Sequence, residues 1–219
     1  MKTLLLLAVF ATFFSARSAI AADGTIDPYS GKPCYKCHRS KTVGENLHGA
    51  LAGNACAPCH KLSNGSHQQN HSYSEVKVKT SALCYECHAD FSKVVSVHGP
   101  IAENDCLSCH SPHSSAYKYL LKVSVDDLCF KCHEQSDLTG ENATPKTAFR
   151  NKTENLHLLH IKKGKVTCLS CHSPHKSSQS HLILDRNTKG KETPEILYRT
   201  SGSGGSCTSS CHDRLEYSR

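Results

Sequence analysis

The sequence predicts a mainly irregular, elongated fold with short α-helices and little or no β-structure. Three observations support this prediction. The 219-residue chain has no Trp, six Phe and one Met, so the large side chains of an ordinary core are scarce. Long apolar stretches with a helical or strand period are missing. The chain instead contains fourteen Cys and sixteen His, so groups other than apolar side chains must hold it together.

The first residues have the pattern of a secretory leader. Lys2 precedes the apolar run Leu4–Phe14, and Ala19-Ile20-Ala21 resembles a signal peptidase site. The alternative, a membrane anchor, would need about 20 apolar residues. We therefore expect a signal peptide over residues 1–21, cleaved near Ala21 or Ala22. No transmembrane anchor is expected after cleavage, and the protein is expected in the periplasm, with an extracellular or outer-membrane-associated location as alternatives.

All fourteen cysteines fall in seven copies of one pattern, in which two Cys are followed directly by His. Six copies read C-x-x-C-H, and the last reads C-x-x-x-C-H. The cysteines are Cys34, Cys37, Cys56, Cys59, Cys84, Cys87, Cys106, Cys109, Cys129, Cys132, Cys168, Cys171, Cys207 and Cys211. The histidines that follow them are His38, His60, His88, His110, His133, His172 and His212.

C-x-x-C-H is the attachment motif of c-type haem, in which both thiols bond the haem vinyl groups and the histidine ligates iron. A disulfide framework would account for an even number of cysteines, and zinc also binds C-x-x-C. Neither requires His after every second Cys. The sequence therefore predicts seven haem c groups with these histidines as proximal iron ligands, and a haem array as the core. A local disulfide between Cys207 and Cys211 remains the alternative at the last motif.

Further histidines repeat with the motifs. His48 and His98 each lie ten residues after a motif histidine and eight before the next motif, and His160 lies eight before Cys168. This period predicts a heptahaem region over residues 22–219. Its two-haem repeats cover about 34–60, 84–113 and 129–175, residues 134–156 are an insertion in the third repeat, and a single site lies at 207–212.

The repeats also suggest the distal iron ligands. The fixed offset predicts His48, His98 and His160 for the haems at Cys56, Cys106 and Cys168. His113 and His175 share an S-P-H context and are expected to serve the first haem of the next unit, at Cys129 and Cys207. The haem at Cys84 would take His71 or His67. The haem at Cys34 is left with His67, His71, His157 or His181.

The chemistry of these ligands favours electron transfer over catalysis. Methionine ligation is excluded because the only Met is removed with the leader. Bis-histidine iron has low potential and no vacant position for a substrate, so no catalytic residue is assigned and the protein is not expected to be an enzyme. The alternative is a multihaem reductase with one five-coordinate haem, for which the haem at Cys34 is the candidate.

The formal charge of +7 does not indicate a nucleic-acid partner. Lys2 and Arg17 belong to the leader, and seven haems would add fourteen propionates, so the holoprotein would be net negative. Nucleic-acid binding would need a clustered basic face.

The segment Cys106–His133, with Pro112-His113 and a Leu120-Leu121 bridge, resembles the doubled C-x-x-C-H domain of multihaem c-type cytochromes. The opening CLSCHSPH recurs at 168–175, whereas the first unit has KLSN in place of SPHS. The resemblance implies an electron carrier of anaerobic or metal-reducing respiration. Its expected partners are a quinol dehydrogenase, periplasmic or outer-membrane cytochromes, or extracellular acceptors, and a homo-oligomer or filament is a further alternative.

Overall fold

The computed structural model describes residues 34–52, 56–61, 75–76, 81–91, 94–142, 144, 146–185 and 196–219. The expected signal peptide and the candidate ligands His67 and His71 lie outside these ranges.

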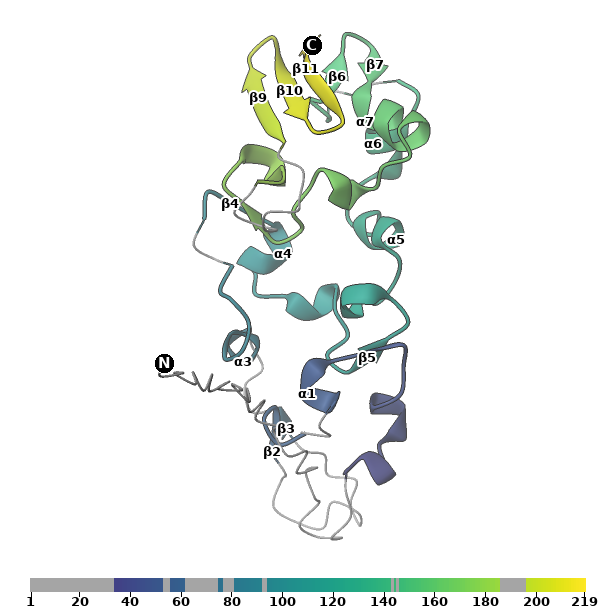
Figure 1. The fold of residues 1–219 in the computed structure, drawn as a ribbon, viewed down its shortest axis with the longest axis vertical. Helices are drawn as coiled ribbons and strands as arrows, with labels where there is room; N and C mark the ends of the chain where they lie inside the picture. Colours follow the sequence, from purple (N-terminus) through teal and green to yellow (C-terminus); the bar gives the residue numbers. More distant parts are fainter. Residues whose placement is uncertain are drawn as a thin grey trace, which may run out of the picture.

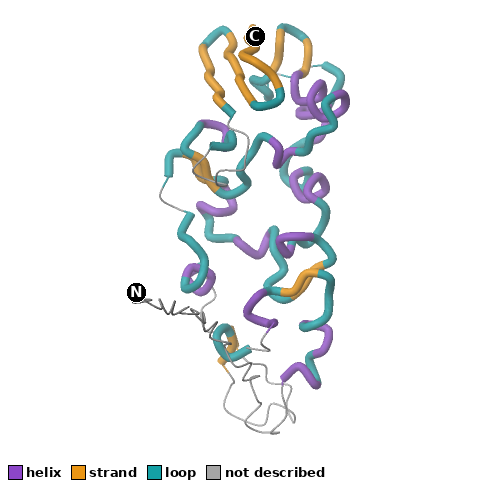
Figure 2. Tube along the Cα trace, in the orientation of Figure 1, coloured by secondary structure: helices purple, strands orange, loops and turns teal. Residues whose placement is uncertain are grey.

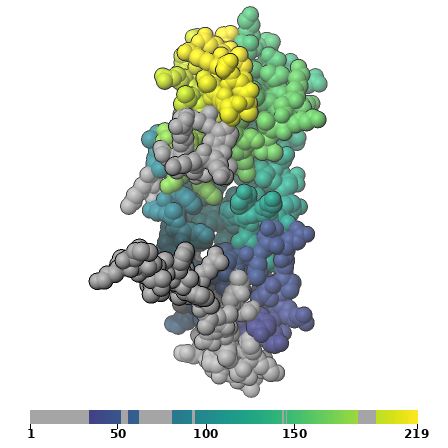
Figure 3. Space-filling model, viewed as in Figure 1, coloured from purple at the N-terminus to yellow at the C-terminus, as the bar shows by residue number. Residues whose placement is uncertain are grey.

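The molecule is elongated, and the sequence runs broadly from one end of its long axis to the other, although residues 176–177 fold back to pair with residues 96–97. Figure 1 shows the segment around residues 34–52 near one end and the C-terminal residues at the other. Figure 3 shows the same order on the surface, from purple near one end to yellow at the opposite end. The described part of the chain is thus stacked along one direction.

The helices are short, and loops join them over most of the length (Figure 2). The α-helices are α1 (Gly49–Ala52), α3 (Ala82–Tyr85), α4 (Gly99–Ala102), α5 (Val125–Cys129), α6 (Gln135–Thr139) and α7 (Leu156–Leu158). The 3-10 turns are η1 (Cys34–Lys36), η2 (Arg39–Lys41), η3 (Cys106–Ser108), η4 (Lys118–Leu120), η6 (Cys168–Ser170) and η7 (Ser180–Leu182), and η5 (Leu159–Lys163) is a π-helical turn. Within the described ranges, no helix has the length and apolarity needed to cross a membrane.

Local sequence explains where α5 begins. The hydroxyl of Ser124 accepts a hydrogen bond from the backbone N–H of Asp127 at 3.2 Å. Asp126 and Asp127 place negative charge in the first turn, where the helix dipole favours it. This N-terminus fixes the start of the turn that carries Cys129.

Short antiparallel strand pairs join distant parts of the chain. β1 (Asn46–Leu47) pairs with β5 (Ser114–Ser115), and β4 (Ser96–Val97) pairs with β8 (Lys176–Ser177). Each pair joins the residues just before one histidine, His48 or His98, to the residues just after an S-P-H histidine of the next repeat. The remaining two-residue pairs are β2 (His60–Lys61) with β3 (Glu75–Val76), and β6 (Arg150–Asn151) with β7 (Glu154–Asn155).

The C-terminal segment forms a three-stranded antiparallel sheet in the order β11-β10-β9. Its strands are β9 (Leu197–Ser201), β10 (Gly204–Ser209) and β11 (His212–Ser218). This sheet corrects the expectation of little or no β-structure. The Gly/Ser-rich run 200–206 supplies the end of β9, a tight turn and the start of β10. Glycine permits this because a side chain at Gly205 would collide with both neighbouring strands.

Buried apolar side chains are few. Within the described ranges they are Leu51, Ile101, Ile183, Leu184, Ile196 and Tyr217. Ile183, Leu184 and Ile196 form one cluster, against which Cys171 and Cys207 pack. Amino-acid side chains alone therefore supply little core for a chain of this length.

Gly205→Ala is expected to destabilise the C-terminal sheet by about 1–3 kcal/mol, the usual cost of overpacking. An added Cβ would lie 2.4 Å from the Arg199 carbonyl oxygen and 2.5 Å from the Tyr217 hydroxyl. Thermal unfolding of the holoprotein, followed at the haem Soret band, measures the effect. Gly202→Ala is the matched control because no atom lies within 4 Å of its added Cβ. Equal melting temperatures for the two variants would contradict the prediction.

Candidate haem-binding sites

Each of the six regular motifs is a single tight turn. The carbonyl of the first Cys accepts hydrogen bonds from the backbone N–H groups of both the second Cys and the His. The bonds to the His N–H are 2.9–3.1 Å long in all six. Residues three and four apart in such a turn share one face. The x-x spacing thus places two thiols and an imidazole beside one another, as the attachment chemistry requires.

The seventh motif is built differently. Cys207 lies on β10, Cys211 lies in the turn that follows, and His212 opens β11. The strand register shifts between Cys207 and Ser209, which accommodates the extra residue of the C-x-x-x-C-H spacing. None of the fourteen cysteines is in a disulfide, including Cys207 and Cys211.

Six motif histidines each face one histidine from outside the motifs. The ring centroids of the two members are 5.9–6.4 Å apart in every pair. The pairs are His60–His113, His88–His48, His110–His175, His133–His98, His172–His157 and His212–His160.

This separation matches what one metal ion between two imidazoles requires. Two metal–nitrogen bonds of about 2 Å, plus roughly 1 Å from each nitrogen to its ring centre, place the ring centres about 6 Å apart. Zinc would need three or four protein ligands. Among the residues that the structure describes, no group of three or more His, Cys, Asp or Glu is arranged to hold a metal. The two imidazoles of each pair could hold one haem iron between them.

The pairing follows a rule that links neighbouring repeats. His48, His98 and His160 each face the first motif of the following unit, at His88, His133 and His212. The two S-P-H histidines face the second motif of the preceding unit, because His113 faces His60 and His175 faces His110. His172 has no later S-P-H segment to face, and His157 takes that place.

These pairs differ from those predicted by sequence offset. The offset assigned His48, His98 and His160 to the nearest following motif and the S-P-H histidines to the next unit's first haem. In the structure, the offset histidines face the next unit's first motif and the S-P-H histidines face the preceding unit's second motif. The reason is that the strand pairs β1–β5 and β4–β8 hold each unit against the next. His157, which the sequence left among the remaining histidines, is paired. The ring of His181 instead lies edge-on to Tyr198, at 6.0 Å between centroids.

The S-P-H segments also hold the other class of histidine in place. The backbone N–H of His48 donates to the His113 carbonyl at 2.9 Å, and that of His98 donates to the His175 carbonyl at 3.1 Å. The His98 ring also hydrogen-bonds the backbone of Pro174. One short segment thus presents its own imidazole to one site and orients the histidine of a neighbouring site.

Burial keeps several of these imidazoles neutral. Desolvation is the main cause that lowers the pKa of six paired histidines below the ordinary value, and it lowers the pKa of His157 to about 4. The six are His48, His98, His113, His157, His172 and His175. The neutral ring is the form that ligates metal.

Thiols of successive motifs also meet. The Cys56 thiol is hydrogen-bonded to Cys34, and Cys106 is hydrogen-bonded to Cys84. In a third pair the thiols of Cys129 and Cys168 interact, which lowers the pKa of Cys129 to about 7 and raises that of Cys168. The Cys168 thiol also donates to the Asp126 carboxylate at 3.6 Å. The two attachment sites of each pair therefore lie directly against one another.

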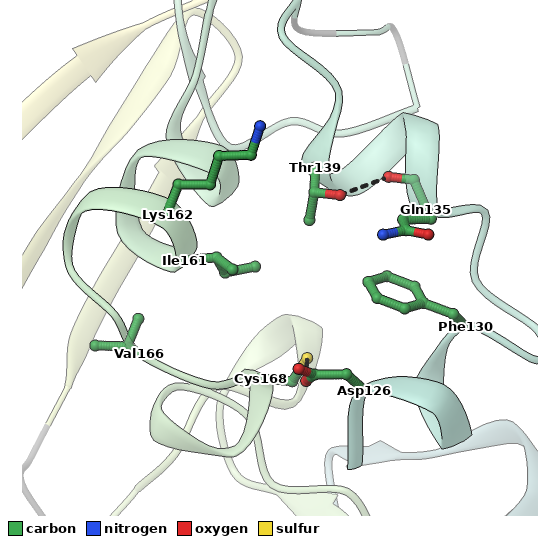
Figure 4. A pocket seen from close by; sticks show the side chains of 8 residues that line it. All are labelled: Asp126, Phe130, Gln135, Thr139, Ile161, Lys162, Val166 and Cys168. Atoms are coloured by element: carbon green, nitrogen blue, oxygen red, sulfur yellow. Dashed lines mark hydrogen bonds between the residues drawn. The ribbon is translucent and has the colours of Figure 1, made fainter. Parts of the chain in front are cut away.

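A cavity of about 180 Å³ adjoins the third thiol pair. Figure 4 shows Phe130 and Ile161 pointing toward each other across it, with Cys168 and Asp126 on one side. The apolar Phe130, Ile161 and Val166 share this lining with the polar Asp126, Gln135, Thr139 and Lys162, beside the attachment cysteine Cys168.

Residues 48–93 and 98–138 match the doubled CXXCH motif family. These two segments are doubled CXXCH motifs. Each begins at a histidine that the structure pairs with a motif in the same segment, His48 with His88 and His98 with His133. The match groups the motifs at Cys56 and Cys84, and those at Cys106 and Cys129. No curated protein matched the chain.

The doubled CXXCH motifs identify the chemistry of the chain in general terms. They indicate covalent binding of c-type haem and, with it, electron transfer. The bound haem would supply reversible one-electron reduction of its iron. The chain's own residues supply the two thiols of each attachment site and the imidazoles that orient and tune the iron.

Proposed function

We propose that the protein is an exported electron carrier that binds seven c-type haems, each attached at one of the seven motifs. The observation that supports this proposal most strongly is the near-constant 5.9–6.4 Å separation of six imidazole pairs. We assign the paired histidines as the two axial ligands of six irons. Bis-histidine ligation leaves no iron position for a substrate, which favours electron transfer over catalysis at these six sites.

Two kinds of contact support a linear order of the haems. Thiol contacts join the first motif to the second, the third to the fourth and the fifth to the sixth. Contacts between non-motif histidines join the second site to the third, through His48 and His113, and the fourth to the fifth, through His98 and His175. The sixth and seventh are joined through His157 and His160, which both contact the Phe149 ring. The thiol contacts and the histidine contacts alternate along the chain. Electrons would therefore pass from site to site in sequence order.

Export and partners are proposed on the sequence alone. The leader pattern over residues 1–21 supports passage out of the cytoplasm. Bacteria attach haem c to proteins outside the cytoplasm, after export. Quinol dehydrogenases, other cytochromes or extracellular oxidants are the redox partners that such a carrier would meet.

Mass spectrometry and electron paramagnetic resonance of the oxidised holoprotein test the proposal. We expect a mass increase of seven haems over the mature polypeptide and low-spin ferric signals only. Fewer than seven haems would contradict the stoichiometry. A stoichiometric high-spin signal that shifts on addition of nitrite or cyanide would contradict the carrier and favour a reductase.

A further inference from the structure

Two motif histidines are held by the same uncommon turn. The Nδ1 atom of His110 lies 2.8 Å from the Tyr119 carbonyl oxygen, and the Nδ1 atom of His172 lies 2.9 Å from the His181 carbonyl oxygen. In both cases the carbonyl belongs to the residue nine positions after the motif histidine. A carbonyl oxygen only accepts, so Nδ1 must carry the proton and donate it. The Nε2 lone pair is then left for the metal.

Both carbonyls are presented by consecutive residues with left-handed backbone. The φ angles are 60° and 58° at Tyr119 and Leu120, and 58° and 56° at His181 and Leu182. None of these residues is glycine, and left-handed conformation costs such residues free energy unless the surroundings impose it. The same pair of left-handed residues therefore occurs twice, each time at the carbonyl that accepts from the Nδ1–H of a motif histidine.

Backbone hydrogen bonds tie each turn to its motif. In the first copy, Ser111 N–H donates to the Leu120 carbonyl at 2.8 Å, and Lys122 N–H donates to the Cys109 carbonyl at 3.0 Å. In the second copy, the equivalent bonds run from Ser173 to Leu182 and from Leu184 to Cys171, both at 2.8 Å. In each copy, these two backbone hydrogen bonds fix the position of the carbonyl relative to the imidazole.

His60 offers an internal contrast. Its Nδ1 atom is buried and has no hydrogen-bond partner among the described residues. In sequence, the first unit has KLSN directly after His60, where the later units have SPHS. Among the described residues, no carbonyl meets the His60 Nδ1 atom as one meets the Nδ1 atoms of His110 and His172.

A carbonyl that accepts from Nδ1–H fixes the ring and makes Nε2 a stronger donor to the metal. Stronger donation favours ferric over ferrous iron and lowers the reduction potential. We infer that Tyr119 and His181 are positioning residues whose backbone carbonyls lower the reduction potentials of the haems on His110 and His172. This inference rests on the proposed haem binding.

Matched substitutions at Tyr119 test the inference without removing a ligand. Its side chain is 77 % exposed, so its loss changes little packing. Tyr119→Val places a β-branched residue where φ is positive, which that class avoids, whereas Tyr119→Asn places a residue that tolerates this backbone. We expect Tyr119→Val to shift one of the seven midpoint potentials upward in a spectroelectrochemical titration of the full holoprotein. Tyr119→Asn should leave all seven unchanged.

The second copy repeats the experiment at another haem. His181→Val should raise one midpoint potential, and His181→Asn should leave all seven unchanged. This pair of variants decides the question if Tyr119→Val fails to give holoprotein. On the unaltered protein, the Nδ1–H signals of His110 and His172 in paramagnetic NMR should exchange slowly with D₂O. Fast exchange of both signals would overturn the inference.

The inference and the proposed function fail in different ways. Seven low-spin haems with the same potentials in the Val and Asn variants would overturn the role of the carbonyls and leave the carrier intact. An equal shift in both variants would also overturn it, because the side chain and not the turn would then set the potential. Fewer haems or a high-spin iron in the unaltered protein would instead contradict the proposed function.

Discussion

Replacing both His48 and His88 with alanine is expected to perturb one haem, whereas replacing His48 and His60 is expected to perturb two. His48 and His88 lie 6.0 Å apart between ring centroids and are assigned to one iron, while His60 faces His113. Each single replacement should convert one of seven low-spin irons to high spin. Two changes at one iron are not additive, but two changes at different irons are.

Quantitative electron paramagnetic resonance, with haem content checked by mass, counts the perturbed irons. Pairing by sequence offset makes the reverse prediction, because it assigns His48 and His60 to the same iron. One perturbed iron in the His48/His60 variant would therefore refute the structural pairing. Added imidazole should restore the low-spin signal in His48→Ala. His181→Asn is the control, since the His181 ring faces Tyr198 and no motif histidine, and Asn tolerates the left-handed backbone at this position.

Chain produced without haem attachment is expected to be largely unfolded. Fixing each backbone residue costs on the order of 1 kcal/mol, and the few buried apolar side chains of the described ranges cannot offset that cost over this length. The covalently bound cofactor would have to supply the missing contacts. Far-ultraviolet circular dichroism and amide hydrogen exchange of the haem-free and haem-loaded chains measure the difference.

Residual protection in the haem-free chain is expected only near the C-terminal sheet. Ile183, Leu184 and Ile196 form the apolar cluster there, and Phe149 packs against Tyr198 and Tyr217. A sharp, cooperative thermal transition of the whole haem-free chain would contradict the prediction. The haem-loaded protein at the same pH is the reference.

The chemistry of the site could be predicted from the sequence because it is local. Cys106, Cys109 and His110 are brought together by one turn, and their spacing alone identifies what they bind. The candidate non-motif histidines could also be found, since His48 and His98 repeat at a fixed offset. The pairing within the described residues could not, because it depends on contacts across repeats such as Asn46–Ser115 and Ser96–Ser177.

The sequence indicates the two left-handed turns and the C-terminal sheet only weakly. Tyr119-Leu120 and His181-Leu182 are ordinary residue pairs, and their left-handed backbone arises from surrounding hydrogen bonds. The sheet was obscured by a Gly/Ser run that is equally typical of a loop. Gly204 and Gly205 instead allow β10 to lie close between two strands, which becomes evident only in three dimensions.

The exchange of histidines between repeats makes the array resemble a solenoid with a cap. An internal repeat receives one imidazole from the unit before it and one from the unit after it, so no internal repeat completes its own sites. Residues 176–219 contain no further S-P-H segment that could supply a histidine to His172. His157, directly after the insertion at 134–156, fills that position from within the repeat. Repeat proteins commonly need such an altered terminal unit. Copies of the standard repeat could therefore be inserted ahead of this cap and lengthen the array without a new kind of contact.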